Sequence, residues 1–174
     1  MTLALYATIW IALAGFVAAD AAKHRRPVPD WAWPISLAGA ILCAAHIVIA
    51  FGHHHHWNHD AAIAETARQT AAVYGLAWGG GVYVNYAFLA AWLVDLWWWR
   101  AHPSEYFARP APVVWVMRAF FFTIIFNAAV VFASAPRRVA GLAVSIALLV
   151  IWVTDLNRRA VRAGPPIDAR PPHE

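Results

Sequence analysis

The amino-acid sequence predicts an all-α integral membrane protein, a bundle of about five transmembrane helices with one short interfacial helix. Hydrophobic residues make up 62% of the 174-residue chain and charged residues only 13%, and the mean hydropathy is +0.54. Apolar runs with few or no charges recur at the length of about 20 residues that a helix needs to cross a bilayer. Basic residues and several of the eleven Trp lie near the ends of these runs, as interfacial anchors do. We therefore expect a lipid bilayer to surround most of the chain.

The first two spans are predicted over residues 3–22 and 31–52. The first run carries no charge before Asp20, and a basic cluster follows it. Since a signal peptide has its positive charge in front of the apolar run, we expect a retained span. Trp31 begins the second run as an interfacial aromatic, and Pro34 falls in the first helical turn, where its missing N–H is tolerated.

A polar, alanine-rich segment over residues 60–74 separates the second span from the third. Its modest amphipathicity predicts the short interfacial helix, unless the segment only extends the second helix into water. A glycine run opens the third span and Trp-Trp-Trp-Arg closes it, a proline-rich turn precedes the fourth, and Ala-Pro-Arg-Arg leads into the fifth. These three spans are predicted over residues 78–99, 113–134 and 139–157. Residues 1–163 then form one transmembrane domain, and residues 164–174 a Pro-rich polar tail without fixed structure.

Five spans put the termini on opposite sides, and the basic residues predict the orientation. With the N-terminus outside, the inner side receives Lys23, Arg25, Arg26, Arg100, Arg109, Arg158, Arg159, Arg162 and Arg170. The outer side receives only Arg68, Arg137 and Arg138. The positive-inside rule therefore predicts that the N-terminus is outside and the C-terminus cytoplasmic. All but one of the 13 Lys and Arg residues are Arg, which favours a GC-rich bacterial genome and hence the bacterial inner membrane.

Five of the nine histidines lie between residues 53 and 59, where the second apolar run ends. If the helix continues through this stretch, His55 and His59 lie one turn apart on the same face. Imidazole and carboxylate groups are common ligands of divalent metals. The sequence therefore predicts a periplasmic metal site, for copper or zinc rather than iron, with ligands drawn from His53, His55, His56, His59, Asp60 and His46. The alternatives are a polar interfacial stretch with incidental metal affinity and a pH-responsive surface.

Polar residues inside the predicted spans are costly in lipid, so each indicates a specific contact. His46 lies two helical turns before His53 on nearly the same face, and is either a hydrogen-bonded core histidine or a ligand of a metal or cofactor. Asn85, Tyr86 and Asn127 fall in the outer halves of their spans, which predicts a polar pocket beneath the histidines. Haem bound by two histidines of this chain is disfavoured, because no other span contains a histidine; haem shared with a partner subunit stays open.

Three charged residues lie near the cytoplasmic ends of their predicted spans: Asp95, Arg118 and Asp155. The favoured interpretation is a structural ion pair across helices, because paired charges satisfy each other where lipid does not. A proton or ion path and snorkelling of the side chains to the interface are the alternatives.

Several functional classes are excluded by what the sequence contains. No basic stripe or module indicates nucleic acid binding. The glycine run is not followed by the Lys-Ser/Thr of a phosphate loop, no His-Glu-x-x-His is present, and no Ser lies in a nucleophile elbow. The single Cys43 excludes an intrachain disulfide. Whether the protein is an enzyme is left open.

The function expected from the sequence is metal handling, or a redox or assembly role, for a small membrane protein with a histidine-rich site at the periplasmic surface. One alternative is an accessory subunit without metal that packs against other membrane subunits. Another is a membrane-embedded metal-dependent enzyme, for which the chain offers few ligands.

Overall fold

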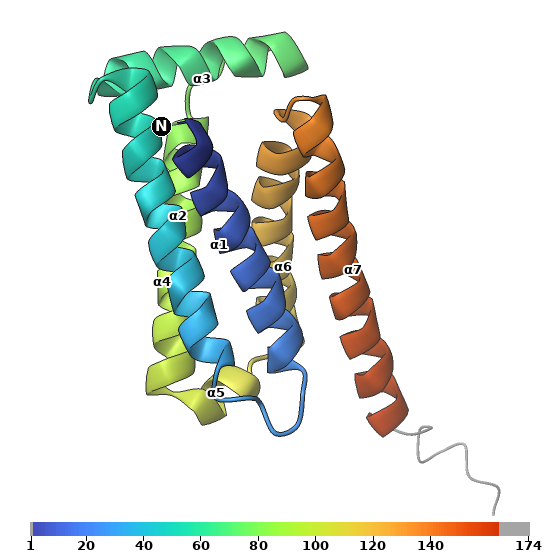
Figure 1. The fold of residues 1–174 in the computed structure, drawn as a ribbon. Helices are drawn as coiled ribbons and strands as arrows, with labels where there is room; N and C mark the ends of the chain where they lie inside the picture. Colours follow the sequence, from blue (N-terminus) through green and yellow to red (C-terminus); the bar gives the residue numbers. More distant parts are fainter. Residues whose placement is uncertain (1, 164–174) are drawn as a thin grey trace, which may run out of the picture.

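The computed structural model describes residues 2–163, with side chains for residues 3–158; the tail predicted over residues 164–174 lies outside the described residues. Residues 2–163 form helices and no strand, which confirms the all-α class. Five long helices stand side by side, α3 lies across one end of the bundle, and the short α5 lies at the other (Figure 1). We refer to these as the α3 end and the α5 end. The helices are α1 (Thr2–Lys23), α2 (Ala32–His55), α3 (His59–Tyr74), α4 (Gly81–Ala101), α5 (Pro103–Phe107), α6 (Ala111–Phe126), the π-helix η1 (Asn127–Val131) and α7 (Ala135–Ala163).

Among the described residues, four segments are long and apolar enough to cross a membrane, so the chain is a multi-pass membrane protein. They are Leu3–Lys23, Ala32–His55, Ala111–Val131 and Ala135–Arg158, and they coincide with four of the five predicted spans. The predicted third span corresponds to α4, which has 21 residues and packs against α2 and α6. It does not reach the hydropathy of the others because it is rich in Trp and Tyr and contains Asn85 and Asp95. Residues 2–163 therefore contain five helical segments of spanning length, α6 together with η1 being one of them, and four of the five are strongly apolar.

The turn between α2 and α3 sets the direction of the helix that crosses the bundle. His56 and Trp57 both have positive φ, 49° and 62°, and this left-handed backbone ends α2. Asn58 then caps α3, its side-chain oxygen accepting a hydrogen bond from the Ala61 N–H at 3.0 Å. Gly75, with φ of 72°, ends α3 in the left-handed conformation that glycine adopts without strain. The predicted interfacial helix is thus α3, and it does not extend α2.

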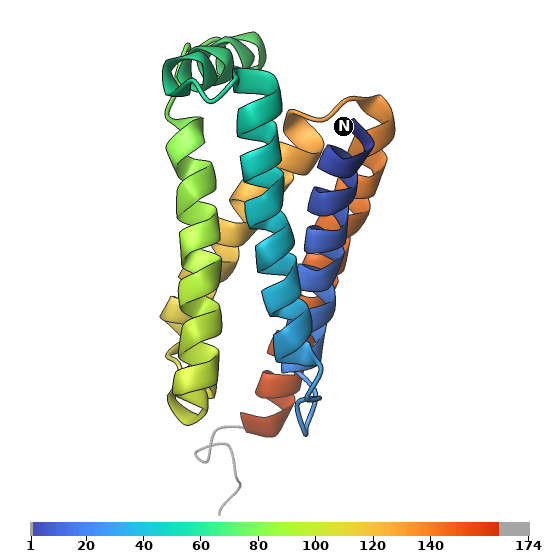
Figure 2. The same ribbon diagram turned by 60° about the vertical axis from the view of Figure 1, so that its left-hand side comes forward.

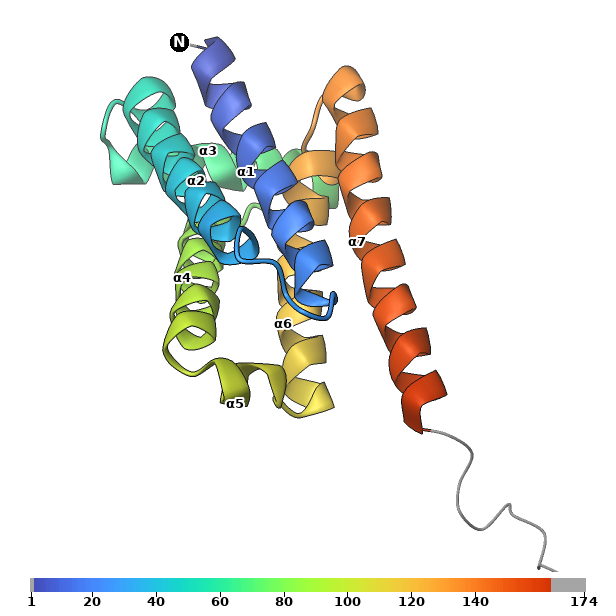
Figure 3. The same ribbon diagram turned by 60° about the horizontal axis from the view of Figure 1, so that its bottom comes forward.

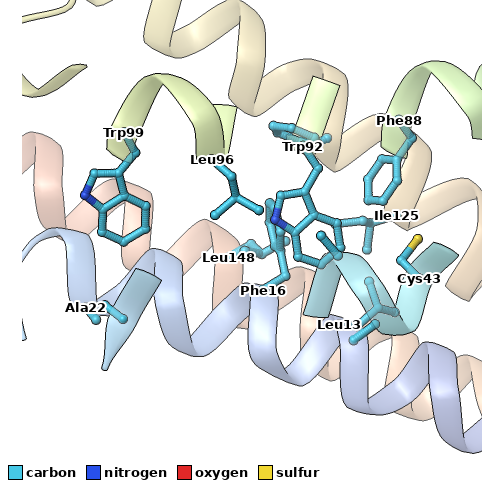
Figure 4. Close-up of a cluster of buried hydrophobic side chains, with 14 of the residues drawn as sticks. Leu13, Phe16, Ala22, Cys43, Phe88, Trp92, Leu96, Trp99, Ile125 and Leu148 are labelled. Carbon is cyan, nitrogen blue, oxygen red and sulfur yellow. The ribbon is translucent and has the colours of Figure 1, made fainter. Parts of the chain in front are cut away.

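The core lies where α1, α2, α4, α6 and α7 meet, and Trp92 is at its centre. Trp92 is 1% exposed and contacts the Phe16 ring edge-on, with ring centroids 4.9 Å apart. In Figure 4 it lies among Leu13, Phe88 and Ile125. Its indole N–H donates to the Ser36 hydroxyl at 3.1 Å, so the one polar atom of the ring is satisfied inside the bundle.

The second half of the bundle departs from regular helix geometry near the α3 end. The Phe132 N–H donates to the Asn127 carbonyl five residues earlier at 2.9 Å, which defines η1. α7 packs against η1, α6 and α1 and stands at the edge of the bundle (Figure 3). α6 runs obliquely to α4 (Figure 2). Because α6 is oblique, η1 at its end lies apart from α2 and α4 at the α3 end (Figure 2, Figure 3).

Candidate functional site

The histidine-rich stretch is divided between two helices. His55 is the last residue of α2 and His59 the first of α3, with the left-handed turn between them. The one-turn spacing expected for a continuous helix is therefore not formed. The His55 and His59 rings instead lie on the Phe51 ring, with centroids 6.1 Å and 5.9 Å from it. Helix α2 ends within the run of histidines, and no Pro or Gly between His55 and His59 indicates that end in the sequence.

The predicted metal ligands do not gather into one centre. Among the described residues, no group of three His, Cys, Asp or Glu side chains is placed to hold a metal ion. His54, His56 and Asp60 are exposed, and the His53 and His54 rings contact each other edge-on at 4.9 Å. Metal binding stays a prediction.

His59 makes its contacts with the aromatic residues at the start of α4. Its Nε2 lies 3.3 Å from the Tyr83 hydroxyl, and its ring stacks on Tyr86 with centroids 6.2 Å apart and an angle of 18° between planes. These contacts join α3 to α4. The predicted pocket included Tyr86 but not Tyr83, which lies almost one turn earlier on α4 and in the same half of the span.

A cavity of about 360 Å³ lies directly beneath this layer, at the α3 end of the bundle. Side chains from α1, α2, α3, α4 and α6 line it, together with η1, the connection after η1 and the start of α7. Most of the lining is apolar, including Trp10, Phe51, Phe88 and Phe132. The polar and sulfur-containing lining residues are Tyr6, Cys43, His46, His55, Thr66, Asn85, Tyr86 and Arg137. The predicted pocket residues His46, Asn85 and Tyr86 are thus brought to one cavity, together with His55.

One ring nitrogen of His46 is hydrogen-bonded, and the other is available to a ligand. Its Nδ1 lies 2.8 Å from the Leu5 carbonyl oxygen. Because a carbonyl only accepts, Nδ1 carries the hydrogen and the neutral ring leaves Nε2 with a lone pair. Nε2 makes no hydrogen bond within residues 3–158. The cavity wall therefore contains a hydrogen-bond acceptor, or a metal ligand, fixed in orientation by α1.

Asn127 lies outside this cavity lining. Its amide donates to the Thr123 carbonyl at 2.7 Å, and its side-chain oxygen accepts from the Tyr74 hydroxyl. The polar pocket is formed without it. Asn127 instead joins the last residue of α3 to the start of η1.

The charged residues predicted to pair across helices lie at the α5 end in two clusters. Arg118 and Asp155 form an ion pair at 2.9 Å, and His24 Nδ1 lies 3.1 Å from the same carboxylate. Asp95 pairs instead with Lys23 at 3.0 Å and Arg109 at 2.7 Å.

Tyr106 of α5 completes the Asp95 cluster. Its hydroxyl donates to the Asp95 carboxylate at 2.8 Å. Burial, with a contribution from the charge of Asp95, raises the pKa of Tyr106 to about 12, so the hydroxyl stays protonated and remains a donor. Lys23, Arg109 and Tyr106 were missed as partners because sequence analysis had assigned all three to connecting loops.

Two cavities are therefore the candidate sites: the one at the α3 end, and a charged one at the α5 end. The single cysteine, Cys43, is buried and lines the first. No protein-family model matches the chain, and the comparisons with curated proteins and with solved structures give no match.

Proposed function

We propose that this membrane protein binds a small, largely apolar molecule carrying a hydroxyl or similar donor in the cavity at the α3 end. The observation that carries the proposal is the available Nε2 of His46 in the wall of an apolar cavity of about 360 Å³. Small-molecule sites are commonly clefts of about 300–1,000 Å³ with mostly apolar walls and a few placed polar groups. An acceptor in such a wall selects ligands that bring a donor, because a buried donor without a partner is costly.

The surroundings of His46 support the same type of ligand. The lining residues His55, Asn85 and Tyr86 belong to the α3 end, where the bundle meets the polar residues of α3. The Asn85 side chain makes no hydrogen bond within the described side chains. The ligand's apolar body would lie against Leu13 and Phe88 and its polar end against these groups.

The π-helix supplies part of the cavity wall. Ala128 and Ala129 of η1 line the cavity, and π-helical segments inside α-helices occur frequently at functional sites. A regular α-helix would rotate these residues and change the width of the cavity. The irregular segment is therefore part of what forms the site.

The test compares two probes that differ by one hydroxyl, 2-naphthol and naphthalene. Both are titrated by calorimetry into tag-free protein in lipid nanodiscs. We expect wild-type protein to bind naphthol about five to tenfold more tightly than naphthalene, the value of one hydrogen bond of about 1 kcal/mol. His46→Phe, which keeps an aromatic ring and removes the acceptor, should abolish this preference.

His102→Phe is the matched control, because His102 lies at the α5 end with a side chain that is 48% exposed. Cys43 locates the probe: as the only cysteine and a lining residue, it should react more slowly with N-ethylmaleimide when naphthol is bound. Equal preference for naphthol in wild type and His46→Phe, or no protection of Cys43, would contradict the proposal.

Metal binding at the same histidine is the second candidate function. A histidine that donates Nδ1–H to a carbonyl and presents Nε2 has the arrangement typical of metal ligands, and His55 lines the same cavity. Copper or zinc bound there predicts about one metal ion per chain in tag-free protein, measured by elemental analysis. His55→Ala/His59→Ala should lose this metal while the bundle stays folded; metal-free wild-type protein would exclude this candidate.

The proposal includes the orientation of the bundle in a bacterial inner membrane. At the α5 end lie Lys23, Arg25, Arg26, Arg100, Arg109 and Arg158, and at the α3 end lie Arg68, Arg137 and Arg138. The positive-inside rule then puts the α5 end in the cytoplasm and the cavity toward the periplasm. A green fluorescent protein fused to the C-terminus should fluoresce, since it folds in the cytoplasm, whereas a fused alkaline phosphatase that is active would reverse this orientation.

A further inference from the structure

The cavity at the α5 end differs in chemistry from the one beneath α3. It has a volume of about 250 Å³ and lies between the ends of α1, α4, α6 and α7, with α5 beside it. Its cationic lining residues are Lys23, Arg26, Arg109, Arg118 and Arg158, and its carboxylates are Asp20, Asp95 and Asp155. With His24 neutral, the cations outnumber the carboxylates. The cavity is therefore positively charged.

The carboxylates are already occupied by groups of the protein. Asp95 accepts from Lys23, Arg109 and Tyr106, and Asp155 accepts from Arg118. The Asp20 carboxylate accepts from the Trp152 indole N–H at 2.7 Å. These contacts fix the walls of the cavity by joining α1 to α4 and α7, and α6 to α7.

Among the described residues, two guanidinium groups at the cavity have no carboxylate partner. Within the described side chains, Arg26 and Arg158 form no ion pair; Arg26 lies over the Phe107 ring at 5.6 Å. A guanidinium presents five N–H donors and pairs with phosphate oxygens through two parallel hydrogen bonds. The excess positive charge is thus carried by Arg26 and Arg158, and guanidinium groups are well suited to bind an oxyanion.

We propose that this cavity binds a phosphate group through Arg26 and Arg158, supplied either by an anionic phospholipid or by soluble phosphate. Basic pockets between transmembrane helices at the membrane surface are a known form of anionic headgroup site. The cavity lies at the ends of four long helices, and Trp98 and Trp115 lie at the same end. Helix ends and interfacial Trp residues are expected at the depth of the lipid headgroups. The paired residues around Asp95 and Asp155 supply the rigid frame.

Native mass spectrometry in detergent tests the proposal with three probes: phosphatidylglycerol, phosphatidylcholine and inorganic phosphate. Wild-type protein should bind phosphatidylglycerol at least about tenfold more tightly than Arg26→Gln/Arg158→Gln does, because two charge-assisted contacts are lost. Neither residue has an ionic partner among the described residues, so the substitutions leave no buried charge uncompensated. Zwitterionic phosphatidylcholine should bind weakly to both proteins.

Arg25→Gln/Arg100→Gln is the matched control, since both residues are exposed at the α5 end and neither lines the cavity. It removes the same charge and should change the affinity less than about twofold, as expected for screened surface charges. Inorganic phosphate that binds alone, and with the same dependence on Arg26 and Arg158, would identify soluble phosphate as the source. Equal losses in the two double variants, or no loss in either, would overturn the proposal.

Discussion

Asp95→Asn is expected to destabilise the bundle by about 3 kcal/mol, because it removes the negative charge shared by two cations with little access to water. The Asp95 side chain is 8% exposed, that of Arg109 10% and that of Lys23 14%. Asparagine has nearly the same size, so the change is one of charge and hydrogen bonding. Its amide nitrogen is a donor that replaces one of the two accepting oxygens, so it would face either the Arg109 guanidinium or the donors of Lys23 and Tyr106. The free energy of unfolding, followed by circular dichroism in mixed micelles with increasing dodecyl sulfate, measures the effect.

Asp30→Asn is the control for this measurement, since Asp30 is exposed in the turn before α2. It should change the free energy of unfolding by less than about 0.5 kcal/mol. Combining Asp95→Asn with Lys23→Met removes one of the uncompensated cations and keeps the length of the side chain. The double variant should be less destabilised than the sum of the single changes, which is the behaviour of directly interacting charges. Additive effects, or a loss in Asp95→Asn no larger than in Asp30→Asn, would show that the cluster carries no such pairing.

The fold class and the spans followed from the sequence because they depend on properties that accumulate over many residues. Length and hydropathy identify a helix in lipid almost regardless of its neighbours, since every backbone polar group must be satisfied within the segment. The short helix α3 was predicted for a related reason, because residues 60–74 form a polar segment between two apolar runs. α4 shows the boundary of this reasoning: it is long enough, yet Trp97, Trp98 and Trp99 keep its hydropathy below that of the other spans.

The geometry of the candidate sites could not be predicted in the same way, because it depends on the backbone conformation of a few residues, which composition does not determine. The left-handed turn at His56 and Trp57 separates His55 from His59, although the spacing in sequence fits one helical face. The sequence also did not determine which cation pairs with Asp95. Arg118 lies at a similar depth, but the α4–α5–α6 connection brings Arg109 within 2.7 Å instead. The sequence predicts that these charges lie at one end of the bundle, but the path of the connection from α4 to α6 determines which of them pair.

The cavity beneath α3 contains both predicted and unpredicted parts. His46, Asn85 and Tyr86 were expected to converge because they share a depth in the membrane. The prediction took Asn127 from the fourth span, but the residues of η1 that line the cavity are Ala128 and Ala129. No sequence pattern in Asn127–Val131 distinguishes a π-helix from an α-helix. What α7 shows is the packing of this segment, since Gly141 lies against the Ala129 carbonyl of η1.

Gly141→Ala is expected to destabilise the bundle by about 2–3 kcal/mol through overpacking. A Cβ atom at Gly141 would lie 2.0 Å from the Ala129 carbonyl oxygen and 2.5 Å from its carbonyl carbon. These are backbone atoms of η1, so no side-chain rotation relieves the contact and α7 must move away. The usual gain from replacing a helical glycine by alanine, about 0.5–1 kcal/mol, is smaller than this cost. The same unfolding measurement in mixed micelles gives the difference.

Gly15→Ala provides the graded comparison, because its Cβ would lie 3.3 Å from the nearest atom, the Ile35 carbonyl oxygen. That contact is tight but needs only a small adjustment, so we expect a cost below about 1 kcal/mol. Gly141→Ala should also weaken naphthol binding, since displacing η1 moves Ala129, which lines the cavity. If Gly141→Ala were as stable as wild type, the close approach of α7 to η1 would be wrong. If it were destabilised while naphthol affinity stayed unchanged, η1 would be a packing feature only, and His46 would have to bind its ligand without that wall.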